Sequence, residues 1–437
     1  MTERNVVLVR MIKFLCRKVL SIFLILFVLE LSSVVAQQDP GNYDESKVPA
    51  YTLPDPLLFN DGTRVVTKHD WDKRRAEIYK MFSEEIYGII PQWHGKVEVT
   101  PVSRKENVFD GLATREEVML HIKNGNNQIN ALLLIYIPHS PKPVPVFLGY
   151  NFYGNHTITS EPDITLTPGW VRNNDQYGIT EHKATEGSRG LFVSRWPIKE
   201  ILSRGYGIVT LNYGDIDPDD RDEFKNGVHR LFDEQRDRTS WGKISSWAWG
   251  LSRVMDYLET NKAINAKQVA LIGHSRLGKT ALWAGASDQR FALVISNNSG
   301  RVGAALTKRI YGEPLDYMQA NIPYWFCENF SKYAGKENLL PVDQHELLAL
   351  IAPRPVYVAS AEKDLWADPK GEYLSCVAAS SVYKFLGEMG FPSQMMPPVN
   401  HPVTGTIGYH IRTGKHDVTL YDWQCFMDFA DSHFKKQ

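Results

Sequence analysis

The sequence predicts an α/β fold in which a mostly parallel sheet is covered by helices on both faces. From residue 144 onward, short apolar runs typical of buried strands alternate with longer stretches typical of helices. Two strand-like runs joined by a turn come before this alternation and predict an antiparallel start to the sheet. The chain of 437 residues has no internal repeat and no clear linker, so we expect one catalytic domain over residues 37–437.

The first expected elements lie between residues 70 and 137. A helix is predicted over residues 70–87, because its apolar residues recur at roughly helical spacing. Strands are predicted over residues 115–122 and 131–137, on either side of the turn-forming segment 123–127.

The middle of the chain combines short elements with two long irregular segments. An apolar run predicts a strand over residues 144–150, followed by a short helix over 198–203 and a strand over 207–212. Residues 158–195 show no strong period, and we expect them to form a long insertion over the site. Residues 215–240 are charged and irregular, with four Asp close together. A calcium site is one interpretation of them, but a solvated loop is favoured.

The last part of the chain continues the alternation. One face of residues 244–261 is apolar, which predicts an amphipathic helix. Apolar runs predict strands over residues 291–296 and 353–361, and the stretches 374–386 and 419–434 read as closing helices.

The N-terminal 36 residues have the pattern of a secretory signal. Basic residues precede an apolar run over residues 19–31, and the small-residue segment Ser33–Ala36 offers a cleavage site. A membrane anchor is the alternative interpretation, but the run is short for a span and a cleavage site follows it. We therefore expect residues 1–36 to be removed and the mature protein to be exported, either to a periplasm or out of the cell.

The composition bears on partners and cofactors. The formal net charge of −1 gives no electrostatic reason to expect nucleic acid or an anionic membrane as a partner. Eleven Trp and 20 Tyr suit either stacking on sugars or core packing. The three cysteines beyond the leader show no disulfide framework and no metal-binding pair, so we interpret them as buried thiols. We expect no cofactor, no metal, no membrane association of the mature form, and a monomer.

The segment 269–280 is the one around which the site is organised. Four apolar residues predict a buried strand, Gly273 permits a sharp turn with Ser275 at its tip, and residues 277–286 read as a helix. A serine on a tight strand-to-helix turn is the nucleophile elbow of the α/β-hydrolase fold. The second glycine, Gly278, comes one residue later than in the usual pattern, so an ordinary turn serine remains the alternative.

A nucleophilic serine needs a base and an acid, which follow it in that fold in the order Ser, acid, His. Asp364 lies at the right distance after the strand 353–361, with Glu362 and Asp368 as rivals. His416 stands directly before the last helix and is favoured over two other candidates, His401 and His410. The polar, glycine-containing loop 151–157 is either the source of a second oxyanion donor or a surface loop.

The segment Gly273–Lys279 (GHSRLGK) resembles the elbow of the glucuronoyl esterases, carbohydrate esterase family 15. Further segments are similar to the bacterial branch of that family, and together the matches cover most of residues 50–435. These segments are LGYNFYGNHT (148–157), SNNSG (296–300), YGE (311–313), DLWADP (364–369) and GYHIRTGKHD (408–417).

The resemblance implies an α/β-hydrolase that cleaves esters of 4-O-methyl-glucuronic acid between glucuronoxylan and lignin alcohols. It implies that Ser275 is the nucleophile, His416 the base and Asp364 the acid. It further implies that Arg276 stabilises the oxyanion, through its backbone N–H and the positive charge of its guanidinium. The residues implied to hold the sugar are Lys279, Glu313 and Trp366.

Two departures from the family pattern concern the site. Fungal members have a glutamate as their acid where this chain has Asn298, so the acid role falls to Asp364. Arg301 stands where smaller residues are expected, and its bulk is expected to reshape the cleft.

Three other functions are alternatives to a glucuronoyl esterase. An acetyl or feruloyl esterase of plant polysaccharide is the nearest alternative, although neutral acyl groups need no cluster of uronate contacts. A non-catalytic glycan-binding protein is disfavoured by the ordered Ser275, Asp364 and His416. A metallohydrolase is disfavoured because no H-E-x-x-H or equivalent ligand spacing is present.

Overall fold

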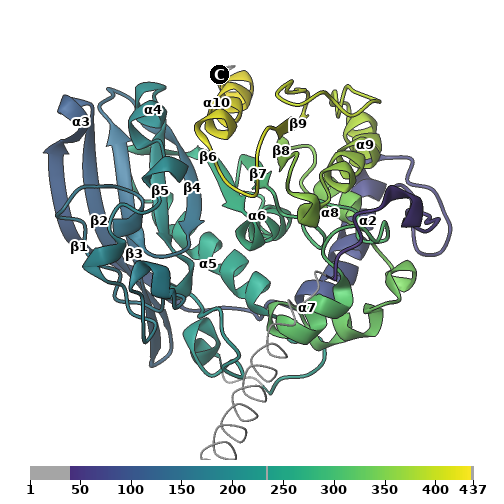
Figure 1. Ribbon diagram of the computed structural model, residues 1–437, viewed down its shortest axis with the longest axis horizontal. Helices are drawn as coiled ribbons and strands as arrows, with labels where there is room; N and C mark the ends of the chain where they lie inside the picture. The colour runs from purple at the N-terminus through teal and green to yellow at the C-terminus, as the bar shows by residue number, and fades with distance from the viewer. Residues whose placement is uncertain (1–39, 233–234, 435–437) are drawn as a thin grey trace, which may run out of the picture. The chain divides into compact units, whose positions relative to one another are not determined.

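A nine-stranded mixed sheet runs through residues 40–232 and 235–434, which are the residues that the computed structural model describes. The strand order is β1-β2-β3-β5-β4-β6-β7-β8-β9 (Figure 1). The strands are β1 (Lys96–Asn107), β2 (Ala113–Asn124), β3 (Asn127–Pro138), β4 (Val144–Asn151), β5 (Gly207–Asn212), β6 (Ile264–His274), β7 (Leu293–Asn297), β8 (Val356–Ala361) and β9 (Ile407–Arg412).

The pairing directions divide the sheet into two parts. Strands β1, β2 and β3 pair antiparallel with one another, and β3 also pairs antiparallel with β5. From β5 to β9 all neighbouring strands are parallel, so their carboxyl ends share one edge. The predicted fold class, with its antiparallel start, is confirmed.

Helices cover both faces of the sheet, as predicted. Along β6 the side chains alternate between two apolar clusters, Val269 and Leu271 joining one and Ala270 and Ile272 the other. The first cluster includes residues of α2 (Lys68–Phe82), α5 (Lys243–Leu258), α6 (Arg276–Ser287), α8 (Gln344–Ala349) and α9 (Pro369–Leu386). The second includes residues of α4 (Ile198–Ser203) and α10 (Leu420–Phe434).

Several elements differ from the sequence-based expectation. The helix expected over residues 70–87 ends as α2 at Phe82 and continues as a π-helical turn, Ser83–Tyr87. Strand β1 was not predicted, because its side chains are mostly exposed and show no apolar alternation. Three short helices and the strand β9 were not predicted either. The helices are α3 (Val108–Gly111), α7 (Leu315–Asn321) and α8.

The segment 215–240 is only in part the solvated loop that the sequence suggested, because its first residues are buried whereas many from residue 220 onward are exposed. The carboxylates of Asp215, Asp217 and Asp219 are buried, and Asp217 also lies close to a lysine and a histidine. Its Oδ1 lies 3.1 Å from Lys243 Nζ, and its Oδ2 lies 2.9 Å from His229 Nε2. The burial of these acids was not predicted, because a run of acidic residues does not reveal the histidine later in the same segment and the lysine on α5 that lie against it.

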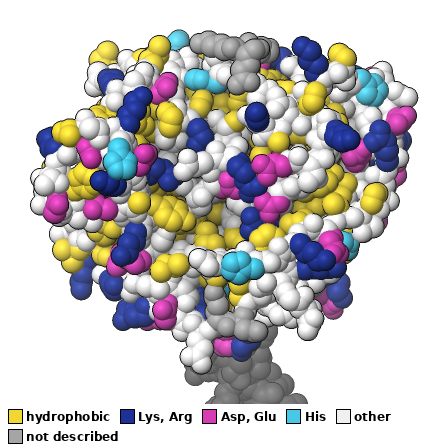
Figure 2. Space-filling view, turned by 180° about the vertical axis from the view of Figure 1, so that it is seen from behind, with side chains coloured by type: hydrophobic (Ala, Val, Ile, Leu, Met, Phe, Trp, Pro, Cys, Tyr) yellow, Lys and Arg dark blue, Asp and Glu magenta, His cyan; other side chains and the backbone are white. Residues whose placement is uncertain are grey.

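The remaining sequence-based predictions concern the leader, the cysteines and the charge. The predicted signal, residues 1–36, lies outside the described residues. In the part of the chain that is described, none of the helices combines the length and apolarity needed to span a bilayer. Cys327, Cys376 and Cys425 are free and buried, as predicted. Acidic and basic side chains are interspersed over the face seen in Figure 2.

Candidate active site

Ser275 lies on a tight turn between the carboxyl end of β6 and the first residue of α6. Its φ of 59° and ψ of −130° are unusual for a residue other than glycine. A Cβ atom on Gly273 would lie 1.9 Å from the Leu277 carbonyl oxygen, and one on Gly278 would lie 2.9 Å from Ser299 Cβ. Both glycines are therefore required by close approach, which explains the wider glycine spacing of this elbow.

His416 and Asp364 form a hydrogen-bonded pair beside the elbow. His416 Nδ1 lies 2.6 Å from Asp364 Oδ2, and the Asp364 side chain is only 5% exposed. Because a carboxylate only accepts, Nδ1 carries the proton and Nε2 is left to accept one. Asn298 Nδ2 donates to the same Oδ2 at 2.8 Å. The position that holds an acid in fungal members thus supports Asp364 here.

The rival candidates lie in other roles. The Asp368 carboxylate accepts from the backbone N–H of Gly371 at the start of α9 and pairs with Arg309 at 3.0 Å. His410 is fully buried and pairs with Asp422 at 2.9 Å. Glu362 accepts the Gly414 N–H at 3.4 Å, and the exposed His401 contacts the carbonyl of Val399.

The imidazole of His416 packs on a second imidazole, that of His274. The ring centroids are 4.5 Å apart, and the Asn297 side-chain amide donates to His274 Nδ1 at 2.9 Å. Burial, reinforced by the neighbouring His416, holds the pKa of His274 well below its ordinary range. His274 is therefore neutral at physiological pH, so its ring adds no positive charge beside His416.

Arg276 is ion-paired with Asp219, one of the four acids in the segment that was expected to be a solvated loop. Asp219 also accepts from the Trp325 indole N–H at 2.7 Å. Burial disfavours the charged guanidinium, but the Asp219 carboxylate outweighs it, and the pKa of Arg276 is raised. The positive charge expected here is thus balanced by a carboxylate. The sequence signal for Asp219 was a set of acids just after β5. The carboxyl end of β5 lies on the same edge of the sheet as Ser275.

A pocket of about 320 Å³ brings the candidate residues together. Its lining includes all seven residues singled out by the sequence analysis, namely Ser275, Arg276, Lys279, Glu313, Asp364, Trp366 and His416. It continues into a cleft of about 690 Å³ that shares Arg276, Glu313, Trp325 and Trp366 with it. No residue of the loop 151–157 is among those that line the smaller pocket.

Lys279 is held firmly at the floor of this pocket. Its Nζ donates to the carbonyl oxygens of Ser299 at 2.5 Å and Arg301 at 2.8 Å, and it lies 3.5 Å from Glu313 Oε2. Burial lowers the pKa of Lys279, and the Glu313 carboxylate opposes this effect. Trp366 also lines this pocket, and its ring meets that of Tyr317 edge-on with the centroids 5.2 Å apart.

Arg301 does not line the pocket, contrary to the expectation that its bulk reshapes the cleft. The side chain is fully buried, donates to the carbonyl oxygens of Glu313 and Thr307, and pairs with Glu337 at 3.1 Å. It therefore ties together the segments behind Glu313. The expectation was wrong because side-chain volume alone does not tell which way the side chain points.

Glu372 on α9 supports the loop behind the pocket and gives a pH-dependent prediction. It accepts the backbone N–H groups of Ser299 and Gly300 at 2.9 and 3.0 Å and contacts the Ser360 hydroxyl. Burial, aided by the charge of Asp364, raises the pKa of Glu372 from 4.5 to about 8. Between these two pKa values, Glu372 keeps its proton in the folded protein but loses it in the unfolded chain. The free energy of unfolding therefore falls as the pH rises through this range.

We expect Glu372→Gln to reduce this loss of stability, because the amide mimics the protonated acid at every pH. Between about pH 5 and about pH 8, the unfolding free energy of the wild type should fall by at least about 1 kcal/mol more than that of the variant. Urea unfolding at the two pH values measures the difference. Parallel pH dependences would contradict the assigned protonation.

The described residues contain no group of His, Cys, Asp and Glu arranged to hold a metal ion. The site is thus built from a half-buried turn serine, an imidazole that meets a carboxylate through one ring nitrogen and leaves the other to accept a proton, and that buried carboxylate. Beside them lie a fixed cation, a carboxylate and an indole. This set of groups can form and hydrolyse an acyl ester on a serine and can bind a polar ring.

The comparisons with known proteins agree with this chemistry. A family model described as "Glucuronyl esterase, fungi" matches residues 179–387. The chain is 48% identical over 408 residues to "Carbohydrate esterase MZ0003" from an unknown prokaryotic organism, spanning 92% of this chain and 94% of that protein. It is 30% identical over 363 residues to "4-O-methyl-glucuronoyl methylesterase 1" of Wolfiporia cocos, spanning 78% of this chain and 74% of that protein.

A solved structure agrees with these sequence matches. The glucuronoyl esterase from Solibacter usitatus superimposes with a TM-score of 0.83 at 43% identity, covering 89% of this chain and 100% of that one. The extent and identity of these matches go well beyond a shared fold. The chain therefore belongs to the glucuronoyl esterase family, carbohydrate esterase family 15, whose members are carboxylic ester hydrolases.

Proposed function

We propose that this protein hydrolyses esters of 4-O-methyl-glucuronic acid that join glucuronoxylan to lignin alcohols, through an acyl-enzyme on Ser275. The observation that carries the proposal is the shared lining of one pocket. Ser275 and the His416–Asp364 pair lie in the same cavity as a lysine, a glutamate and a tryptophan that suit a uronate ring. The family membership and the names of the relatives support this substrate class.

In the acylation step, His416 Nε2 takes the proton of the Ser275 hydroxyl as Oγ attacks the ester carbonyl carbon. The Asp364 carboxylate accepts from Nδ1 and stabilises the imidazolium that forms. The carbonyl oxygen becomes an oxyanion, to which the backbone N–H of Arg276 at the start of α6 can donate. His416 then gives its proton to the leaving alcohol oxygen, and the carbon–oxygen bond of the ester breaks.

In the deacylation step, a water molecule replaces the alcohol. His416 takes a proton from the water as its oxygen attacks the acyl carbon, and a second oxyanion forms at the same place. When the bond to Oγ breaks, His416 returns the proton to Ser275. The products are the free glucuronate and the alcohol, and the enzyme returns to its starting state.

Recognition of the acyl group rests on Lys279, Glu313 and Trp366. The contact of Lys279 Nζ with Glu313 Oε2 is long, at 3.5 Å, so a sugar hydroxyl that replaces it can accept from Lys279 and donate to Glu313. An indole face suits the ring of a sugar. An acetyl or feruloyl ester is a weaker interpretation, because a neutral acyl group offers Lys279 and Glu313 no ring hydroxyls to bind.

We expect Lys279→Met to discriminate between these substrates. The variant should lower kcat/KM for benzyl D-glucuronate about 10²-fold, because a charge-assisted contact to the sugar is lost, while p-nitrophenyl acetate turnover stays within about threefold. Lys308→Met is the matched control, since Lys308 Nζ also donates to two backbone carbonyls, at 3.0 and 2.6 Å, but lies outside the pocket lining. Equal losses on both substrates would contradict a role in sugar recognition.

The function itself is tested by hydrolysis of benzyl D-glucuronate by the mature protein, residues 37–437. Turnover of this ester in preference to p-nitrophenyl acetate is the expected result. A well-folded protein that hydrolyses only acetyl or feruloyl esters would favour the alternative substrates.

We also infer that the protein is exported and acts as a monomer on this substrate, without nucleic acid or membrane partners. The signal-like pattern of residues 1–36 supports export. Mass spectrometry of the secreted form tests export. The expected result is a new N-terminus near Gln37.

A further inference from the structure

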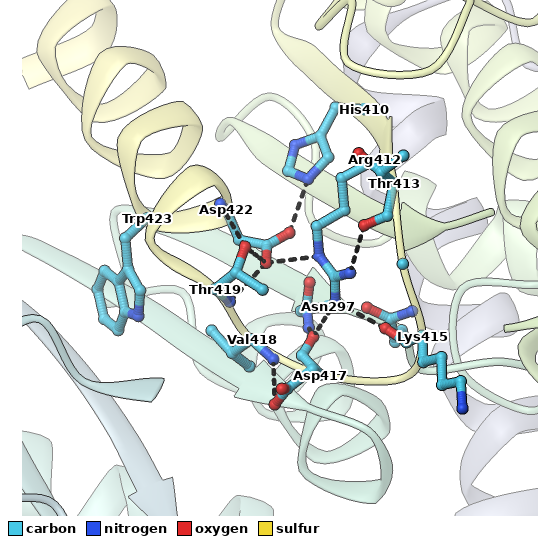
Figure 3. Close-up of polar contacts among 12 residues, drawn as sticks. Asn297, His410, Arg412, Thr413, Lys415, Asp417, Val418, Thr419, Asp422 and Trp423 are labelled. Atoms are coloured by element: carbon cyan, nitrogen blue, oxygen red, sulfur yellow. Dashed lines mark hydrogen bonds and ion pairs between the residues drawn. The ribbon is translucent and has the colours of Figure 1, made fainter. Parts of the chain in front are cut away.

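Arg412, the last residue of β9, binds the loop of residues 413–417, which includes His416; Figure 3 shows its guanidinium directed toward Lys415 and Asp417. Its Nη2 donates to the carbonyl oxygens of Lys415 at 3.0 Å and Asp417 at 2.6 Å, and its Nη1 donates to that of Thr413 at 3.0 Å. Residues 415 and 417 are the two neighbours of His416 in the chain. The guanidinium therefore holds the backbone on both sides of the imidazole.

The guanidinium is itself fixed by Asp422 on the first turn of α10. Arg412 Nε donates to Asp422 Oδ2 at 2.7 Å, and the two side chains are 4% and 0% exposed. The same carboxylate accepts from the backbone N–H and the hydroxyl of Thr419, both at 2.7 Å, and its Oδ1 lies 2.9 Å from His410 Nε2. Arg412 thus connects β9, the loop and α10 through one buried group.

Asn297, at the end of β7, contributes a second donor to the same loop. Its Nδ2 donates to the Asp417 carbonyl oxygen at 2.9 Å and also contacts His274 Nδ1. The Asp417 carbonyl therefore accepts from both Arg412 and Asn297 (Figure 3).

The loop is also tied at a few other points. The Lys363 N–H donates to the Gly414 carbonyl at 3.0 Å, Arg195 pairs with Asp417 at 2.6 Å, and Asp364 accepts from His416. Thr413, Lys415 and His416 are exposed, and Gly414 adopts a φ of 104°. A segment with few buried side chains opens easily unless its backbone groups are tied down. Arg412 contacts the backbone on both sides of His416, so the position of the imidazole relative to Ser275 depends strongly on its bonds and on that from Asn297.

We propose that Arg412 is a positioning residue for His416, and that Asn297 assists it through the Asp417 carbonyl. This inference rests on the proposed function, in which His416 is the base. Neither side chain lines the pocket that holds Ser275. Their contribution is to keep Nε2 of His416 aimed at Ser275 while Nδ1 meets Asp364. Displacement of a reacting group by about 1 Å can lower the rate about 10²-fold.

The test uses Arg412→Lys in the full mature chain. Lysine keeps a positive charge near Asp422 but lacks the planar fork that serves several carbonyls at once. Arg354→Lys is the matched control, because Arg354 also donates to three backbone carbonyls, those of Gly285, Asp288 and Phe291. These contacts lie at the opposite end of the parallel strands, ahead of β7 and β8.

We expect Arg412→Lys to lower kcat for benzyl D-glucuronate about 10²-fold with KM changed by less than about threefold. The rate at which a sulfonyl fluoride modifies Ser275 should fall by a similar factor, since that reaction also needs the base. Arg354→Lys should lower the melting temperature but leave both rates within about twofold. If Arg412→Lys does not fold, Asn297→Ala replaces it, with an expected kcat loss of about tenfold.

A folded Arg412→Lys variant with kcat and serine-modification rate close to the wild type would overturn the proposal. So would equal kinetic losses in the Arg412 and Arg354 variants, which would indicate a merely structural role. His416→Ala separates this failure from failure of the proposed function. If His416→Ala keeps activity, His416 is not the base, whereas its inactivity beside an active Arg412→Lys variant would refute only the positioning role.

Discussion

Replacing Ser275 by Ala should lower kcat for benzyl D-glucuronate by about 10⁴-fold or more, because the acyl-enzyme cannot form without Oγ. Alanine and serine tolerate a positive φ about equally, so the elbow at φ 59° should keep its conformation. The variant should therefore still bind glucuronic acid. Steady-state kinetics and calorimetric binding of the product measure the two effects separately.

Ser287→Ala is the matched control for this prediction. Ser287 is the last residue of the same helix, and its hydroxyl donates to the Trp283 carbonyl, far from the pocket lining. We expect this variant to keep kcat within about twofold of the wild type. A Ser275→Ala enzyme that retains more than about a tenth of the wild-type kcat would exclude the acyl-enzyme mechanism.

Replacing Asp364 by Asn should lower kcat about 10³- to 10⁴-fold with little change in KM. The buried carboxylate fixes the His416 tautomer and stabilises the imidazolium that forms during both steps, and an amide does neither well. Asn298 also donates to Asp364 Oδ2. The neutral amide oxygen of an asparagine would accept more weakly from Asn298 and His416 than the carboxylate does.

Glu362→Gln and Asp368→Asn test the two rival acids. Glu362 is partly exposed and contacts the backbone of Gly414, and Asp368 caps α9 and pairs with Arg309. We expect both variants to keep kcat within about threefold, although Asp368→Asn should lower the melting temperature. A large kcat loss in either one, with an active Asp364→Asn enzyme, would move the acid role to that residue.

The elbow was predictable from the sequence because its determinants are local. A buried strand, a glycine that must accept close approach and a following helix occupy consecutive residues, 269–286. The order Ser, acid, His restricted the partners to a few candidates near 364 and 416. The resemblance to a known family narrowed them further and suggested the residues expected to hold the sugar.

The partners of these residues were not predictable, because they come from distant segments. The acids after residue 214 were expected in a solvated loop, whereas Asp219 pairs with Arg276, 57 positions later. The bulk of Arg301 was expected to reshape the cleft, whereas that side chain is buried and donates to the Glu313 carbonyl. Side-chain direction and ion pairing across the chain leave no periodic pattern in a sequence.

The sequence by itself thus determined the fold class, the elbow and the short set of candidate residues, since each depends on local pattern and chain order. The tertiary structure alone decided which groups surround them. Three contacts join residues from different elements: the Asn298 amide with Asp364, the Asp219 carboxylate with Arg276, and the Arg412 guanidinium with the backbone of the His416 loop. Such contacts arise only when the carboxyl ends of parallel strands meet at one edge of the sheet.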